Sequence, residues 1–219
     1  MRLLDVLIYN MMIKYILIFL LICTPVYAAS VDDKLPTSGD EYSYSTWNDE
    51  DWSPNPNPST APNITANDGT AATSLAPTWD TGNYTVGLRG QTFDFSGIPA
   101  GATIDGVTVE LNAWHDNGGV DWNLCMLLDV DGDPVGTNLC SDTPQDISAT
   151  ADGTNYTEGG AAETWGNSLT DTWVKDADFG ILVGFIATGN NADVYVDTIL
   201  MTITYTESAG RTRRISITN

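Results

Sequence analysis

The chain has 219 residues, 42% of them hydrophobic, and a formal net charge of −21. Its length suits one domain with tails, and its apolar content is sufficient for a hydrophobic core. With 29 acidic residues against 8 basic ones, it lacks the basic surface that nucleic-acid binding requires. The composition therefore excludes a nucleic-acid partner and disfavours anionic polymers and lipids.

Residues 1–28 have the pattern of an export signal. Lys14 precedes an apolar run from Tyr15 to Cys23, and the small-residue cleavage pattern ends at Ala28. The run is shorter than a spanning helix normally is. We therefore expect a secreted or cell-surface protein with no membrane association after signal removal. Residues 29–42, which are mostly polar, are expected to form a flexible N-terminal segment.

The stretch FDFSGIPAGATIDGVTVEL, from Phe93 to Leu111, predicts the central strand of the domain. Pro99 and its flanking glycines predict a turn over Ser96–Gly101, because proline fixes φ and restricts the residue before it. A strand then follows from Ala102 to about Trp114. Its apolar positions alternate with polar ones, as expected for a strand with one buried face; the apolar positions are Val107, Val109, Leu111 and Ala113, and they alternate with Thr108, Glu110, Asn112 and Trp114.

A hairpin is predicted around Asp131–Pro134. If Val130 and Val135 close its loop, the register places Cys125 opposite Cys140. A cross-strand disulfide between these cysteines would suit an oxidising compartment. In this register both cysteines lie on the face away from the apolar set Trp122, Leu124, Met126 and Leu128.

The same hairpin carries closely spaced acids, Asp129, Asp131 and Asp133. Carboxylates spaced in this way, with a glycine, can bind calcium, which is the only cofactor that the sequence suggests. The EF-hand pattern is not met, because its glycine and glutamate positions do not match. We therefore favour an acidic turn, in which Asp-Gly serves the turn geometry, over a calcium site.

Two strong strands close the domain, joined by the loop Thr188–Asp193. No segment has helical periodicity over three turns. The many short strands predict an all-β fold, a single-domain antiparallel β-sandwich of jelly-roll type over residues 43–206, with a closed barrel as the alternative. Residues 207–219 form a basic C-terminal tail. The residues expected to share one face are Phe179, Ile181, Val183 and Phe185 in the first strand, and Tyr195, Ile199, Met201, Ile203 and Tyr205 in the second.

The order of these elements over residues 45–206 resembles two groups of β-sandwich proteins. One comprises phage and prophage virion structural proteins of tails or appendages, and the other comprises non-catalytic carbohydrate-binding-like modules of secreted polysaccharide-degrading enzymes. Both groups share the Ile-Pro-x-Gly-Ala-x-Ile turn and strand. The virion group also shares Trp165-Gly166, Phe179-Gly180 and a closing strand that ends at Tyr205-Thr206. The resemblance implies a jelly-roll sandwich that serves recognition or assembly.

The sequence gives little support for a catalytic function, because His115 is the only histidine and no recognisable nucleophile or zinc-ligand spacing is present. Trp114 has the outward parity of its strand and, with Asn112 and His115, forms the candidate ligand-binding group. For any one tryptophan, however, core or edge packing is the commoner role. We expect an exported, non-catalytic recognition or assembly module that associates with copies of itself or with other subunits. The alternatives are a carbohydrate-binding module for a polysaccharide and a virion appendage protein with a misassigned start.

Overall fold

The structure is a computed structural model, and it describes ten stretches of the chain. The predicted signal peptide, apart from Ala28, and all but the first two residues of the predicted basic tail lie outside the described residues. Within the described part, no helix is long and apolar enough to cross a bilayer. The described residues are 28–42, 52–53, 61–74, 84–116, 120–128, 131–136, 145–147, 149, 154–187 and 193–208.

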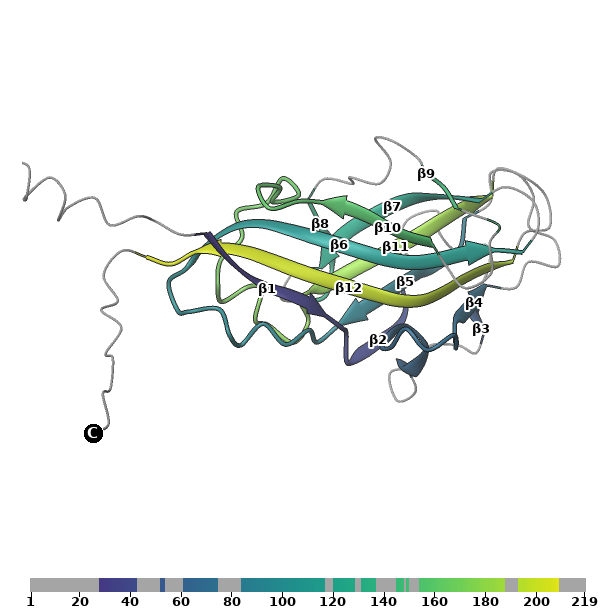
Figure 1. The fold of residues 1–219 in the computed structure, drawn as a ribbon, viewed down its shortest axis with the longest axis horizontal. Coiled ribbons are helices and arrows are strands. Elements are labelled where there is room, and N and C mark those ends of the chain that lie inside the picture. The colour runs from purple at the N-terminus through teal and green to yellow at the C-terminus, as the bar shows by residue number, and fades with distance from the viewer. Residues whose placement is uncertain are drawn as a thin grey trace, which may run out of the picture.

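The fold is an all-β sandwich of two antiparallel sheets, as predicted (Figure 1). The first, sheet A, has the strand order β10-β6-β12-β4-β3, and β1 pairs with the other half of β12. The second, sheet B, has the order β2-β5-β11-β7-β8, and β9 also pairs with β7. A short 3-10 helix, η1 (Ala61–Ile64), precedes β4.

The chain crosses between the two sheets several times. Sheet A comprises β1 (Ala28–Lys34), β3 (Trp52–Ser53), β4 (Ala72–Ser74), β6 (Thr103–His115), β10 (Thr154–Gly159) and β12 (Val194–Thr206). Sheet B comprises β2 (Ser38–Tyr42), β5 (Gly87–Gln91), β7 (Val120–Leu128), β8 (Pro134–Val135), β9 (Gln145–Asp146) and β11 (Gly180–Ala187).

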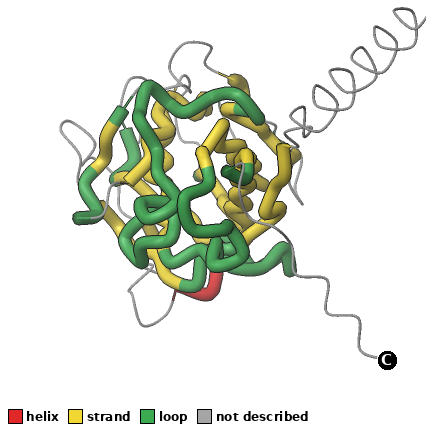
Figure 2. Tube along the Cα trace, turned by 90° about the vertical axis from the view of Figure 1, so that its left-hand side faces the viewer, coloured by secondary structure: helices red, strands yellow, loops and turns green. Residues whose placement is uncertain are grey.

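The core lies between the sheets and is formed by alternate residues of their strands. The predicted inward set of β6 is confirmed, because Val107, Val109 and Leu111 are fully buried. The predicted inward set of β11, from Phe179 to Phe185, is also part of the core. Loops cover the end of the sandwich that faces the viewer in Figure 2. The period-two pattern therefore identified the buried face of both strands correctly.

The N-terminal segment differs from the expectation of a flexible tail over residues 29–42. β1 pairs with the C-terminal half of β12, and β2 pairs with β5 at the edge of the other sheet. The sandwich thus begins at Ala28 rather than at residue 43. Ala29 and Val31 pack against the core between polar neighbours. The alternation of apolar and polar residues in β1 is too short to be recognised in the sequence. Pairing with the long β12 is what orders the segment.

The pairing of β6 with β12 contains a bulge at Asp197. Val196 pairs with Ala113, whereas Thr198 pairs with Asn112, so one extra residue is inserted in β12. An inserted residue exchanges the two faces of a strand on either side of it. The prediction that Tyr195 shares the core face with Ile199 is therefore wrong, while the prediction for the rest of that set is confirmed.

The hairpin after β7 has a different register from the predicted one. Leu128 pairs with Pro134 rather than with Thr137, a difference of three residues. The turn is built around Gly132, whose φ of 80° lies in the left-handed region that favours glycine. The predicted disulfide was derived from the other register; on the opposite side of β7, Cys125 pairs with Val183 of β11, and the disulfide stays a prediction. Cys140 lies outside the described residues.

Strand β10 and the buried Trp165 lie in a mostly polar stretch of the chain between β9 and β11. β10 pairs with β6 along its whole length. The loop after it turns back over β6, where the fully buried Trp165 donates its indole N–H to the carbonyl oxygen of Val107 at 3.0 Å. The Val107 N–H in turn donates to the Glu163 carbonyl at 2.9 Å. This loop closes one end of the core.

Gly106 allows that loop to approach β6. A Cβ at Gly106 would lie 2.2 Å from the carbonyl oxygen of Gly160 and 2.5 Å from the carbonyl carbon of Ala161, both backbone atoms. We expect Gly106→Ala to lower the free energy of unfolding by about 1–3 kcal/mol, the usual cost of overpacking. Urea denaturation measures this. Gly97→Ala is the matched control, because its Cβ would meet only Val31 at 3.7 Å. Equal stabilities of the two variants would contradict this packing.

Candidate aromatic and polar site on sheet A

Two aromatic side chains form a stacked pair on the outer face of sheet A. Trp114 of β6 lies directly opposite Tyr195 of β12 in the antiparallel register. Their ring centroids are 5.2 Å apart and the ring planes differ by 4°. Both residues are half-buried. Each ring therefore covers one face of the other, which leaves the remaining surface of the pair available to solvent or a ligand.

A chain of polar side chains continues along the same face of the sheet. Asn112 precedes Trp114 by two residues and pairs with Asn155 of β10. The Asn112 amide donates to the Asn155 side-chain oxygen at 2.8 Å, and the Asn155 amide donates to a Glu110 carboxylate oxygen at 2.9 Å. These bonds fix the orientation of both amides. Asn155 is exposed and can meet a ligand, whereas Asn112 is buried.

Two carboxylates lie at the end of the sheet next to the aromatic pair. Asp116 and Asp193 hold the ends of β6 and β12 together, because the Asp193 N–H donates to an Asp116 carboxylate oxygen at 2.9 Å. The Asp116 N–H donates to the Asp193 carbonyl oxygen at 3.2 Å. Burial raises the pKa of Tyr195, and the negative charges of Asp116 and Asp193 raise that pKa further. The aromatic pair thus lies in a negative field.

The structure separates the three residues predicted to bind a ligand. Trp114 and Asn112 share the outer face of sheet A. His115 pairs with Val194 of the core and is 7% exposed, and its Nδ1 has no hydrogen-bond partner among the described residues. His115 is therefore not placed beside Trp114 on the outer face.

Sequence reasoning missed Tyr195 as the cross-strand partner of Trp114, and it missed Asn155 and Glu110 as polar partners along the same face. Glu110 has the same parity as Trp114, so the strand pattern contained a signal for it. Tyr195 was assigned to the core because a bulge cannot be read from the alternation of β12. Asn155 was missed because β10 itself was not predicted. Its sequence, TNYTEG, has a single buried aromatic residue, Tyr156.

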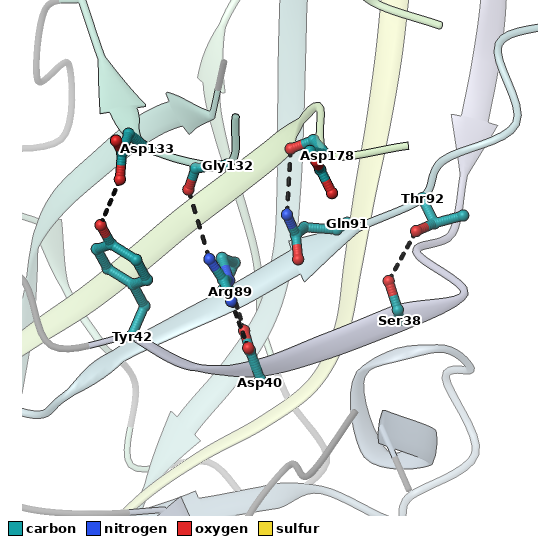
Figure 3. Close-up of polar contacts among 9 residues, drawn as sticks. All are labelled: Ser38, Asp40, Tyr42, Arg89, Gln91, Thr92, Gly132, Asp133 and Asp178. Atoms are coloured by element: carbon teal, nitrogen blue, oxygen red, sulfur yellow. Dashed lines mark hydrogen bonds and ion pairs between the residues drawn. The ribbon is translucent and has the colours of Figure 1, made fainter. Parts of the chain in front are cut away.

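The acidic hairpin tip is engaged by neighbouring strands of sheet B (Figure 3). The Tyr42 hydroxyl donates to an Asp133 carboxylate oxygen at 2.7 Å, and the Arg89 guanidinium donates to the Gly132 carbonyl at 3.4 Å. Arg89 also forms an ion pair with Asp40 and lies 4.8 Å from the centre of the Tyr42 ring. The tip thus fastens the edge strand β2 to the hairpin.

These contacts bear on the alternative interpretation of Asp129, Asp131 and Asp133 as a calcium site. Asp129 lies outside the described residues, and the Asp133 carboxylate accepts a hydrogen bond from the Tyr42 hydroxyl. In the described stretches, no group of three or more His, Cys, Asp or Glu side chains could hold a metal ion. The interpretation of this segment as an acidic turn is consistent with the turn geometry of Gly132 and with the hydrogen bond to Asp133.

The sequence and the structure were compared with those of known proteins. No family model matches the sequence, and no curated protein matches it significantly. Among solved structures, the chain is similar to the N-terminal cellulose-binding domain of the β-1,4-glucanase C from Cellulomonas fimi. The identity is 15% and the TM-score 0.31, over 87% of this chain and all of that one. At this distance the likeness concerns the fold alone.

The raised pKa of Tyr195 leads to a prediction about the stability of the protein at alkaline pH. Because its folded-state pKa is raised above the ordinary value of 10.0, the folded protein keeps this proton where the unfolded chain loses it. Stability should therefore fall as the pH rises past about 10. Tyr195→Phe removes this contribution, so its free energy of unfolding should fall less over the same range. Parallel loss of stability in both proteins, measured by urea denaturation at pH 8 and above 10, would contradict the prediction.

Proposed function

We propose that this chain is an exported, non-catalytic carbohydrate-binding module that holds a polysaccharide on the outer face of sheet A. The observation that supports the proposal most directly is the stacked, half-buried Trp114–Tyr195 pair beside the exposed Asn155 amide. The C–H faces of sugar rings pack on aromatic side chains, and amide and carboxylate groups exchange hydrogen bonds with sugar hydroxyls. The other predicted role, assembly with protein subunits, has no comparable feature among the described residues.

The charge of the site narrows the class of polysaccharide. The Asp116 and Asp193 carboxylates lie close enough to Tyr195 to raise its pKa, and the whole chain carries a net charge of −21. Anionic polymers such as uronates would be repelled by this field. We therefore propose a neutral polysaccharide as the ligand. The export signal over residues 1–28 supports an extracellular location, where such polymers occur.

Trp114→Ala tests the proposal on an array of neutral and anionic glycans. We expect saturable binding of a neutral glycan by the wild type and a loss of about 30-fold in the variant, corresponding to about 2 kcal/mol for an aromatic hot spot. Tyr195→Phe keeps the stacked ring and should retain most of the affinity. Thr157→Ala is the surface control, because Thr157 is exposed on the same sheet opposite Glu110.

Two results would count against this function. If the wild type retains no glycan while light scattering shows a defined oligomer, the assembly role gains support instead. If Trp114→Ala and Thr157→Ala bind glycan equally well, the ligand site lies elsewhere on the molecule.

A further inference from the structure

The strand β10 forms one edge of sheet A (Figure 1), and among the described strands it pairs only with β6. In an antiparallel ladder, the backbone N–H and C=O groups of successive residues point alternately to one side and to the other. The Gly160 N–H donates to the Val107 carbonyl oxygen at 3.0 Å, so every second residue back from Gly160 faces β6. Asn155, Thr157 and Gly159 therefore direct their backbone groups away from β6. All three are exposed, and these groups form no hydrogen bond within the described part of the chain.

The other edge strands of the sandwich have features that protect an open edge. Natural sheets discourage the addition of a further strand with charges, proline, bulges or very short strands. β1 has an irregular register next to the charged run Asp32–Lys34, and β2 carries Asp40 and Glu41. β3, β8 and β9 have two residues each, and β8 begins with Pro134. By contrast, β10 has six residues in an uninterrupted register, without proline and with the single charge of Glu158.

A second copy of β10 is complementary to this edge. In an antiparallel pairing with a two-fold axis at Thr157, Thr157 lies opposite Thr157 of the second copy, and Asn155 lies opposite Gly159. This register uses the outward groups of all three residues, with two hydrogen bonds in each of the three pairs. It also sets Glu158 opposite Tyr156, so no like charges lie directly across from each other. The edge is thus self-complementary, as an isologous interface requires.

We infer that the protein forms a two-fold dimer in which the β10 strands of two copies pair and join their sheets A into one continuous sheet. The contact consists mainly of backbone hydrogen bonds. Each copy carries a net charge of −21, and the repulsion between copies opposes their association. Because salt screens this repulsion, the dimer should be stronger at high ionic strength.

The symmetry of the dimer bears on the candidate site. The two-fold axis of an antiparallel strand pair is perpendicular to the sheet, so both copies present the outer face of sheet A on the same side. The two Trp114–Tyr195 pairs then face the same way, and one polymer could engage both copies with a gain in avidity. This consequence depends on the proposed function, whereas the strand pairing itself does not.

Sedimentation velocity of the exported chain over a range of protein concentrations, at low and at high NaCl, tests the inference. We expect a dimer fraction that rises with protein concentration and with salt. Thr157→Pro should raise the dissociation constant about tenfold or more, because it removes one outward N–H from each copy at the axis. The ladder with β6 should survive, since proline is tolerated where the N–H of an edge strand faces solvent. Thr157→Ala is the matched control and should dimerise like the wild type, because it keeps the N–H.

Thr157→Asp serves as a second variant in case Thr157→Pro does not fold. It sets two carboxylates opposite each other at the axis, where like charges are destabilising, and it should also reduce the dimer fraction. In Thr157→Cys, the axis brings the two thiols together, and mass spectrometry under oxidising conditions should find a disulfide between the two copies of residue 157. A wild type that stays monomeric at every concentration and salt level overturns the inference. So does a dimer that folded Thr157→Pro or Thr157→Asp forms as tightly as the wild type, or a Thr157→Cys dimer without that disulfide. None of these measurements depends on glycan binding.

Discussion

The antiparallel pairing of β6 with β12 is the interaction on which the rest of the structure depends. Each strand has thirteen residues, and together they form the middle of sheet A, with β10 on one side and β4, β3 and β1 on the other. The pairing buries Val107 and Ile203 inside the sandwich, and it also decides which side chains face outward. The single residue inserted at Asp197 is what brings Tyr195 onto the outer face beside Trp114.

The two ends of this strand pair are used differently. Near the start of β6, the loop with Trp165 folds over Gly106 and closes the core. Near the end of β6, Asp116 and Asp193 hold the strands together, and the aromatic pair lies on the surface. One end therefore contributes stability through buried contacts, whereas the other presents partly exposed rings and amides, the groups from which a binding site can be built.

The sequence predicted the layered architecture well, because burial of one face imposes a period of two on a long strand. This explains the correct inward sets of β6 and β11. The alternation of apolar and polar residues in β12 does not reveal the bulge. Tyr195 was placed on the wrong face for that reason. Polar edge strands leave an equally weak pattern: β2 is ordered by contacts such as the Arg89–Asp40 ion pair, which join residues distant in the chain. The hairpin register was missed because the loop enclosed by Leu128 and Pro134 is one residue longer than the predicted loop, and both loop lengths are common in hairpins.

The candidate site was only partly predictable for the same reason. Trp114 and Asn112 were identified from strand parity, which is a local property. Their partners Tyr195 and Asn155 come from two other strands, and their positions depend on strand pairing and on the bulge. The buried oxygens of Asp197 and Thr198 likewise lie at the bulge. The residues that strand parity did not predict thus lie where the regular alternation is interrupted or where another strand pairs.

The bulge can be tested directly by measuring ring-proton nuclear Overhauser effects in the protein at neutral pH. The register with the bulge predicts cross-peaks between the indole of Trp114 and the ring of Tyr195, whose centroids are 5.2 Å apart. Without the inserted residue, the pairing of Ile199 with Leu111 would continue unchanged and place Tyr195 opposite His115. Cross-peaks from Tyr195 to the His115 ring, with none to Trp114, would contradict the account.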